Sequence, residues 1–289
     1  MQRPDWVDSE LYPFEDQWAE VEGCSVHYVD EGNGPPLLML HGNPTWSFTW
    51  RDVIKGVRDR YRCVALDLPG FGLSSAPAGY GFTPPEHARV VEAFVQQLDL
   101  RDATLLVQDW GGPIGFAVAV RQPERFTAFA IGNTWAWPMT GNPGARIFSA
   151  FLGGPIGGYL IKRRNFFVEK IIPGGTKRVG PDERVMEHYR RPFPTPQSRV
   201  PMHVFPRAII GETPWLREVE QGLASIDDRP ALIVWPTRDQ AFGERERERW
   251  ESTFTDHRTV TLEGAGHYIG EDAPQEIVAA LMEWASSRV

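Results

Sequence analysis

An aspartate, Asp109, stands at a sharp turn that the sequence predicts between a strand and a helix. Residues 103–108 form a short apolar run, which is typical of a strand buried on both faces. A Gly-Gly-Pro segment at 111–113 ends that run before a helical pattern begins. A carboxylate at this turn is ionised at pH 7, because its unperturbed pKa is about 3.9. We therefore expect Asp109 to act as a nucleophile that needs no activating base.

The chemistry of an aspartate nucleophile differs from that of a serine. Alkylation of Asp109 at a saturated carbon would give an ester, whose carbonyl carbon water can attack. A serine alkylated in the same way would become an ether, which water does not readily cleave. An acid at this turn therefore favours displacement at a saturated carbon, followed by hydrolysis of the enzyme ester.

Two further residues complete a catalytic order along the chain. Asp239 follows a predicted strand at 231–235, and His267 lies in a glycine-rich loop at 264–267. Ligands of open α/β sheets bind outside the carboxyl ends of the strands, so we expect these side chains to meet Asp109 there. His267 would be the general base for water, and Asp239 would orient the imidazole. Each residue alone has a structural alternative, a helix cap for either aspartate or a carbonyl-bonded loop histidine, but the three in this order favour catalysis.

Other polar residues fall at predicted strand ends without an equally specific pattern. His41 and Asn43 follow one strand, and Asn133 follows another. Asp67 also ends a strand, but it belongs to an Asp-Leu-Pro-Gly turn that already explains it structurally. We therefore treat Asp67 as a weak catalytic candidate.

The elements that must position these residues alternate along the chain. Residues 17–31 predict two short antiparallel strands joined at Glu22-Gly23. Further strands are predicted at 35–40, 61–68, 103–108, 126–131, 231–235 and 258–262. Helices are predicted at 86–98, 112–120 and 274–284, with apolar residues at helical spacing, and a further helix is expected at 242–250. Strands alternating with helices indicate an α/β fold with a mostly parallel central sheet flanked by helices.

A helical insertion interrupts this alternation after the sixth strand. From 137 to 226 the sequence is helical, aromatic and rich in glycine and proline. We predict a core domain at 1–136 and 227–289, and a helical cap domain at 137–226 that closes the pocket over the strand ends. We expect most of its aromatic residues to belong to the packed core of the cap, and the sequence does not tell which of them face the substrate. Seven aromatic residues are candidates for the apolar lining: Trp135, Trp137, Phe148, Phe151, Phe166, Phe167 and Phe205.

Three motifs resemble those of one enzyme family. His-Gly-Asn-Pro at 41–44, Gln-Asp-Trp-Gly-Gly at 108–112 and Gly-His at 266–267 look like the haloalkane dehalogenases of the α/β-hydrolase superfamily. The resemblance runs from about Leu11 to the last helix. It implies hydrolysis of haloalkanes to alcohol, halide and a proton, through an alkyl ester on Asp109. No cofactor or metal is implied.

The resemblance also implies how a halide and an oxyanion would be held. The side-chain amide of Asn43 and the indole N–H of Trp110 would bind the halide, since both are hydrogen-bond donors. Their backbone N–H groups would form the oxyanion hole. The family's alternative position for the acid falls on Asn133, which cannot serve, so Asp239 is the expected acid. This set resembles the subgroup that combines an Asn–Trp halide pair with an acid after the later strand.

The chain departs from the family pattern after the histidine. Tyr268 stands where the family usually has Phe, and Gly270 stands where it usually has Gln. We expect these differences to affect local packing around the catalytic residues.

Several alternatives share these residues. An epoxide hydrolase would use the same three catalytic residues, with cap tyrosines such as Tyr159 or Tyr189 protonating the epoxide. A luciferase related to the dehalogenases and a non-catalytic ligand-binding protein also remain open. A fluoroacetate-type dehalogenase is disfavoured, because Trp110, Gly112 and Pro113 replace its carboxylate-binding arginines.

The composition of the chain excludes some classes of binding partner. The chain has 289 residues and a net charge of −8, which gives no basic footprint for nucleic acid. Its two cysteines, Cys24 and Cys63, have no metal-ligand spacing and fit a reducing compartment. The polar N-terminal segment and the lack of a long apolar run predict a cytoplasmic protein without a membrane partner. We expect a small apolar halogenated substrate, water and halide as partners, and leave a homo-oligomer open.

Overall fold

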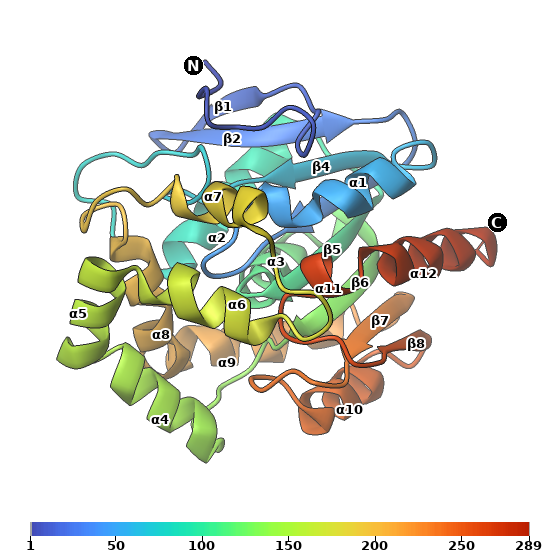
Figure 1. Ribbon diagram of the computed structural model, residues 1–289. Coiled ribbons are helices and arrows are strands. Elements are labelled where there is room, and N and C mark those ends of the chain that lie inside the picture. The colour runs from blue at the N-terminus through green and yellow to red at the C-terminus, as the bar shows by residue number, and fades with distance from the viewer. Residues whose placement is uncertain (1, 289) are drawn as a thin grey trace.

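The computed structural model describes residues 2–288 and is built on one eight-stranded sheet (Figure 1). The strands lie in the order β1-β2-β4-β3-β5-β6-β7-β8. Their bounds are β1 Gln17–Val21, β2 Cys24–Glu31, β3 Pro36–Leu40, β4 Arg62–Leu66, β5 Ala103–Asp109, β6 Phe126–Thr134, β7 Ala231–Pro236 and β8 His257–Leu262. The α/β class predicted from the sequence is confirmed.

Only the first two strands break the parallel arrangement. β2 runs antiparallel to both β1 and β4, and all other neighbours are parallel. The β1–β2 turn places both Glu22 and Gly23 at positive φ, the geometry that suits a two-residue hairpin. β5 is buried along its whole length, as the apolar run predicts for a strand covered on both faces. The carboxyl ends of β3, β5, β6 and β7 therefore meet at one edge of the sheet.

Helices of the core pack in two groups. α1 (Arg51–Val57) packs with α12 (Pro274–Ser286), while α2 (Pro84–Gln97) packs with α3 (Gly111–Arg121). α10 (Glu244–Thr253) contacts β6 and β7, and the short α11 (Ile269–Asp272) precedes α12. α3 is buried for most of its length because it lies between the sheet and its helical neighbours. It begins at the turn that carries Asp109.

The insertion after β6 is helical, as predicted. It contains α4 (Pro143–Leu152), α5 (Pro155–Arg164), a π-helical turn at Phe167–Ile171, α6 (Ile172–Gly175), α7 (Glu183–Arg190), α8 (Val200–Gly211) and α9 (Thr213–Gly222). α9 packs against the core helix α3. The far end of the insertion is thus held against the core. Within residues 2–288, no helix is both long enough and apolar enough to cross a lipid bilayer.

Strand ends differ from the sequence predictions by two or three residues. β4 ends at Leu66, short of the predicted Leu68, because the chain turns at the buried Asp67. β6 continues to Thr134, beyond the predicted Ile131, since Thr134 still pairs with Asp109 of β5. Helices α1 and α11 have no counterpart in the sequence prediction.

Asp67 belongs to a buried structural cluster. Its carboxylate accepts hydrogen bonds from the backbone N–H groups of Ser47 and Leu73, and lies 2.8 Å from His27 Nδ1. Asp16 lies 3.1 Å from the other ring nitrogen of His27. Burial would lower the pKa of His27, but the carboxylates of Asp67 and Asp16 outweigh it and raise that pKa to about 9. The cluster joins the start of the chain to the end of β4.

Candidate functional site

The backbone at Asp109 is strained in the way that exposes a side chain above a sheet. Its φ is +49°, a left-handed conformation that few residues other than glycine adopt. Close packing around the turn requires neighbours without side chains. A Cβ on Gly42 would lie 2.2 Å from Asp109 Oδ1, and one on Gly112 would lie 1.8 Å from Thr134 Oγ1. The glycines next to Asp109 thus allow the turn to form.

The Asp109 carboxylate faces hydrogen-bond donors of the backbone. Oδ1 accepts a hydrogen bond of 2.7 Å from the N–H of Asn43, and the N–H of Trp110 also stabilises the carboxylate. Burial raises the pKa of Asp109, while His267 and the two N–H groups counteract this effect. The carboxylate therefore sits in a buried place that favours a reaction removing its charge.

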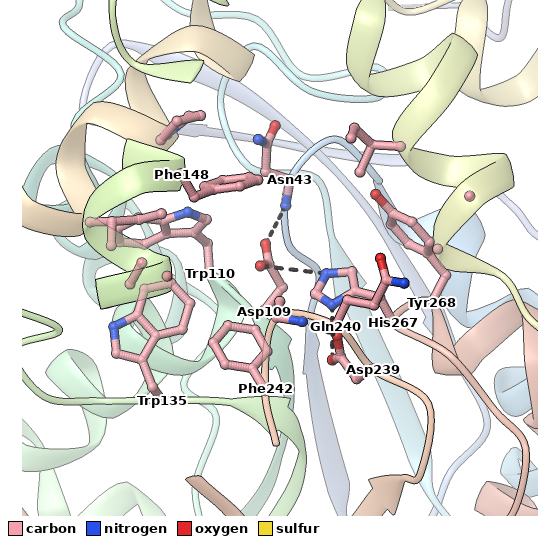
Figure 2. Close-up of a pocket in the computed structure, with 18 of the residues that line it drawn as sticks. Asn43, Asp109, Trp110, Trp135, Phe148, Asp239, Gln240, Phe242, His267 and Tyr268 are labelled. Atoms are coloured by element: carbon pink, nitrogen blue, oxygen red, sulfur yellow. Dashed lines mark hydrogen bonds and ion pairs between the residues drawn. The ribbon is translucent and has the colours of Figure 1, made fainter. Parts of the chain in front are cut away.

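His267 lies between the two aspartates. Its Nε2 is 3.7 Å from Asp109 Oδ2, and its Nδ1 is 3.0 Å from Asp239 Oδ2. Burial would lower the pKa of His267, but the charge of Asp239, its hydrogen bond and the charge of Asp109 raise that pKa to about 9. Asp239 is buried, and its contacts with His267 hold its pKa below the usual range. The structure thus brings together the three residues predicted from the chain order (Figure 2).

Asn133 is a contributor that sequence reasoning passed over. Its amide nitrogen donates to Asp239 Oδ2 at 2.5 Å and to the backbone oxygen of His267 at 2.8 Å. Gln108, just before Asp109, donates to the same backbone oxygen at 3.1 Å. The two amides fix the histidine loop over the end of β5. One feature of the sequence indicates this role: Asn133 lies at the end of a predicted strand, beside the other site residues. From the sequence alone, Asn133 was considered only as a possible acid, which it cannot be.

Asn43 and Trp110 flank the carboxylate, as Figure 2 shows. The Asn43 side-chain amide donates a long hydrogen bond, 3.4 Å, to the backbone oxygen of Met202 in α8. The indole of Trp110 stacks on Phe205 and meets Trp135 edge-on. Among residues 2–288, no acceptor is bonded to the Trp110 indole N–H. Both residues line the same cavity as Asp109 and His267.

The cavity above Asp109 has a volume of about 760 Å³ and lies between the strand ends and the insertion. Four of the seven predicted aromatic residues line it: Trp135, Phe148, Phe166 and Phe167. The other three candidates do not line it. Trp137 packs on Trp250, Phe205 is covered by Trp110, and Phe151 is half exposed on the surface.

The two cap tyrosines considered as proton donors for an epoxide do not line the cavity, whereas a third tyrosine does. Tyr159 is exposed on α5, and Tyr189 donates a hydrogen bond to Glu271, so neither lines the cavity. Tyr268 does line it, on the His267 side of the view in Figure 2. Its hydroxyl is buried and has no hydrogen-bond partner among the described residues, and burial raises its pKa well above the usual value. Sequence reasoning noted Tyr268 only as a departure from a pattern.

His41 and Asp67, two of the polar residues at strand ends, have structural roles. His41 Nε2 accepts a hydrogen bond from the N–H of Leu68, and its Nδ1 donates to the Gly42 oxygen. Asp67 is held in the His27 cluster. Within residues 2–288, no three histidine, cysteine or acidic side chains are grouped so as to hold a metal ion.

A single carboxylate ties the insertion to the histidine loop. Asp272 of α11 accepts hydrogen bonds of 2.7 Å from the N–H of Gly266 and from the N–H of Lys177, which follows α6. A further hydrogen bond of 2.8 Å joins the N–H of His267 to the oxygen of Gly175. The segment that ends α6 is therefore fastened directly to the loop that carries His267.

Comparison with known proteins identifies relatives across nearly the whole chain. A model of the alpha/beta hydrolase fold family matches residues 35–274. Haloalkane dehalogenase 2 of Mycobacterium tuberculosis is 45% identical over 278 residues, covering 96% of each chain. A cis-3-alkyl-4-alkyloxetan-2-one decarboxylase of Shewanella oneidensis is 30% identical and covers 93% of this chain and 87% of its own.

Solved structures give the same picture. The crystal structure of a putative ancestral haloalkane dehalogenase superposes with a TM-score of 0.86 at 31% identity. It covers 94% of this chain and 98% of its own length. The fold of this chain, an eight-stranded sheet with flanking helices, is thus shared with a dehalogenase structure over nearly its whole length.

Proposed function

Because this chain belongs to the haloalkane dehalogenase family of the α/β-hydrolase superfamily, we propose that it hydrolyses haloalkanes to alcohol, halide and a proton. The observation that carries this proposal is the buried Asp109 carboxylate, which lies 3.7 Å from His267 in an apolar cavity. The pocket holds a nucleophile, a base and hydrogen-bond donors for an anion. The expected partners of the protein are a small apolar substrate, water and halide, and its expected location in the cell is the cytoplasm.

In the first step, a carboxylate oxygen of Asp109 attacks the carbon that bears the halogen. A C–O bond forms, the carbon–halogen bond breaks, and the halide leaves with the bonding electrons. Asn43 Nδ2 and the Trp110 indole N–H are the donors proposed to receive the halide. They lie beside Asp109 within a cavity whose surface is largely apolar, so their hydrogen bonds act at a lower dielectric constant than in bulk water.

In the second step, His267 Nε2 removes a proton from a water that attacks the ester carbonyl of Asp109. This step needs a neutral imidazole, whereas the pKa of His267 is about 9 beside two carboxylates. Alkylation removes the charge of Asp109 and with it one of the influences that raise this pKa. The first step thus prepares His267 to act as a base in the second.

The ester carbonyl becomes an oxyanion when water attacks. The backbone N–H groups of Asn43 and Trp110 already stabilise the carboxylate oxygen, so they are placed to stabilise that charge. Collapse of the intermediate breaks the bond between the ester carbon and the alkoxide, which takes the proton held by His267 and leaves as the alcohol. Asp109 returns to its carboxylate form when its own proton passes to water. Asp239 keeps its charge, orients the imidazole and stabilises the imidazolium. We assign residues 137–226 the role of a cap that closes the cavity.

Bromide release tests the proposal. Wild-type protein incubated with 1-bromobutane or 1,2-dibromoethane should release bromide, and Asp109→Ala should release none. Asp256→Ala, on an exposed aspartate, is the matched control and should behave as wild type. Circular dichroism should show that both variants remain folded. Absence of bromide release from the wild-type protein would refute the proposed reaction.

Opening of a strained oxygen ring is a second candidate. Tyr268 gives it specific support, because this residue lines the cavity and its hydroxyl has no hydrogen-bond partner among residues 2–288, which leaves its proton for a leaving oxygen. A relative with 30% identity is named for an oxetan-2-one, which is also a strained oxygen ring. Styrene oxide and a 3,4-dialkyl oxetan-2-one should therefore be assayed beside 1-bromobutane. Turnover of either ring compound without bromide release would favour this second function.

A further inference from the structure

The outer surface of the α4–α5 hairpin is unusually apolar. Among residues 2–288, seven large hydrophobic side chains are exposed, and five of them lie on these two helices: Ile147, Phe148, Phe151, Ile156 and Tyr159. Ile147 is 70% exposed and Ile156 is 66% exposed. Surface patches of this kind are uncommon on isolated globular proteins and mark sites of interaction. We call the five residues the hairpin patch.

Helical spacing places the exposed residues of each helix on a common face. Ile147 and Phe151 are four residues apart on α4, and Ile156 and Tyr159 are three apart on α5, so each pair shares a helix face. The two helices are joined by a tight glycine turn. A Cβ on Gly157 would lie 2.4 Å from the Phe151 oxygen, so the facing helix ends touch. Figure 1 shows the hairpin at the outer edge of the molecule.

Positive charge accompanies the apolar surface. The segment 143–170 contains five basic residues and one acidic residue, a net charge of +4 in a chain whose net charge is −8. Lys162, Arg163 and Arg164 lie at the C-terminal end of α5, and Arg163 continues the face of Tyr159. Within the described residues, none of these three side chains forms an ion pair with a carboxylate. Their charges are therefore available to an outside partner.

We propose that the hairpin patch docks onto the surface of an anionic lipid bilayer. Apolar side chains beside free basic residues are the combination that holds amphipathic helices at such surfaces. A second copy of this chain fits less well, because a symmetric contact would bring two surfaces of net charge +4 together. The sequence-based expectation of no membrane partner considered only spanning segments. The docking surface involves no spanning helix.

The location of the hairpin patch gives docking a consequence for substrate access. Phe148 belongs to the hairpin patch and also lines the catalytic cavity. Lys170, which follows α5 and lies outside the patch, lines the cavity as well. The cavity therefore lies next to the docked surface. Apolar haloalkanes concentrate in lipid, so docking would place the cavity beside its substrate reservoir. Docking is independent of the proposed reaction, whereas this delivery rests on it.

Sedimentation with vesicles tests docking directly. Wild-type protein should bind vesicles of phosphatidylcholine containing about one-third phosphatidylglycerol, and bind much less to phosphatidylcholine alone. Arg163→Glu/Arg164→Glu should weaken partitioning at least about 30-fold, since each basic residue near the surface contributes about fivefold. Arg217→Glu/Arg245→Glu makes the same charge change on exposed arginines elsewhere and should bind as wild type. Raising the salt from ~50 mM to ~500 mM should also weaken binding.

The apolar contribution is tested separately. Ile147→Ser/Ile156→Ser should weaken partitioning by about tenfold for each isoleucine. Val179→Ser, at a residue 78% exposed but outside the hairpin, is the matched control. With water-dissolved 1-bromobutane, both variants should release bromide at the wild-type rate. With 1-bromododecane in anionic vesicles, only the hairpin variant should be slowed.

Docking would be overturned by a wild-type protein that does not bind anionic vesicles, or by Arg163→Glu/Arg164→Glu and Ile147→Ser/Ile156→Ser variants that bind them like the wild type. A concentration-dependent dimer that Ile147→Ser/Ile156→Ser dissociates, with no vesicle binding, would assign the patch to a second copy and also overturn it. Vesicle binding without any bromide release would refute the proposed function while leaving docking intact.

Discussion

Asp239→Asn should separate the two chemical steps. The substitution removes the negative charge that lies 3.0 Å from His267 Nδ1 and leaves the shape of the side chain nearly unchanged. It does not touch Asp109 or the proposed halide donors. The first step should therefore proceed, while the hydrolysis of the ester should slow, because only in that step does His267 take a proton from water and need Asp239 to stabilise the resulting charge.

The magnitude follows from the geometry of this pair. Two unit charges 3.0 Å apart attract one another by about 5 kcal/mol at an effective dielectric constant of about 20. This value is an upper limit for the lost stabilisation, and it corresponds to a hydrolysis rate lower by about 10³- to 10⁴-fold. The hydrogen bond from Asn133 is retained in the variant, because the new amide at position 239 can turn its oxygen toward the Asn133 side-chain N–H.

Rapid-quench measurements of bromide release provide the assay. Asp239→Asn should show a burst of about one bromide per active site, followed by a very slow steady state, and intact mass should show one alkyl group added. Asp256→Asn should show neither the slow phase nor the accumulated adduct. Loss of the burst together with the steady state would refute the separation of roles between Asp109 and Asp239.

Three further perturbations give distinct outcomes. Tyr268→Phe should leave bromide release within about twofold of wild type but abolish any epoxide turnover measured with styrene oxide, since only the second reaction needs a proton on a leaving oxygen. Gly42→Ala should lower bromide release at least about 100-fold, because its Cβ would lie 2.2 Å from Asp109 Oδ1, whereas Gly211→Ala, with open space around it, should have no such effect. His27 has its pKa raised to about 9, so it stabilises the fold fully below about pH 6.5 and loses that contribution as the pH rises through 9; urea unfolding should show a loss of up to about 3 kcal/mol over this range that is absent in His27→Gln.

The sequence predicted the middle of the sheet well because strands such as β3, β5 and β7 are mostly apolar. β5 is buried at every residue, so composition alone marks it, and glycines at 111 and 112 mark the turn that follows. Chain order then predicted that Asp239 and His267 meet Asp109, since parallel strands bring their carboxyl ends to one edge. Helices α1 and α11 were missed because they are short and give little periodicity.

The lining of the cavity could not be predicted in the same way. Most of the seven aromatic residues considered are buried, and sequence does not tell a side chain that faces the cavity from one packed behind it. Phe205 is an aromatic residue of the insertion, as a lining residue would be, but Trp110 covers it. Asn133 and Tyr268 were undervalued for a related reason. Their importance comes from the partners they have or lack in three dimensions.

The Asp272 carboxylate has a consequence for how the cavity opens. Lifting the segment after α6 would break the hydrogen bonds that Asp272 accepts from the N–H groups of Lys177 and Arg178 and leave a buried carboxylate partly unpaired, at a cost of about 1–3 kcal/mol for each lost bond. The same movement would pull on Gly266 and tilt the general base. Substrate, halide and alcohol should therefore pass on the α4 side of the cavity, because movement of α4 would not disturb His267. Changes meant to alter substrate size are best placed on α4, because changes at 174–178 would alter entry and catalysis together.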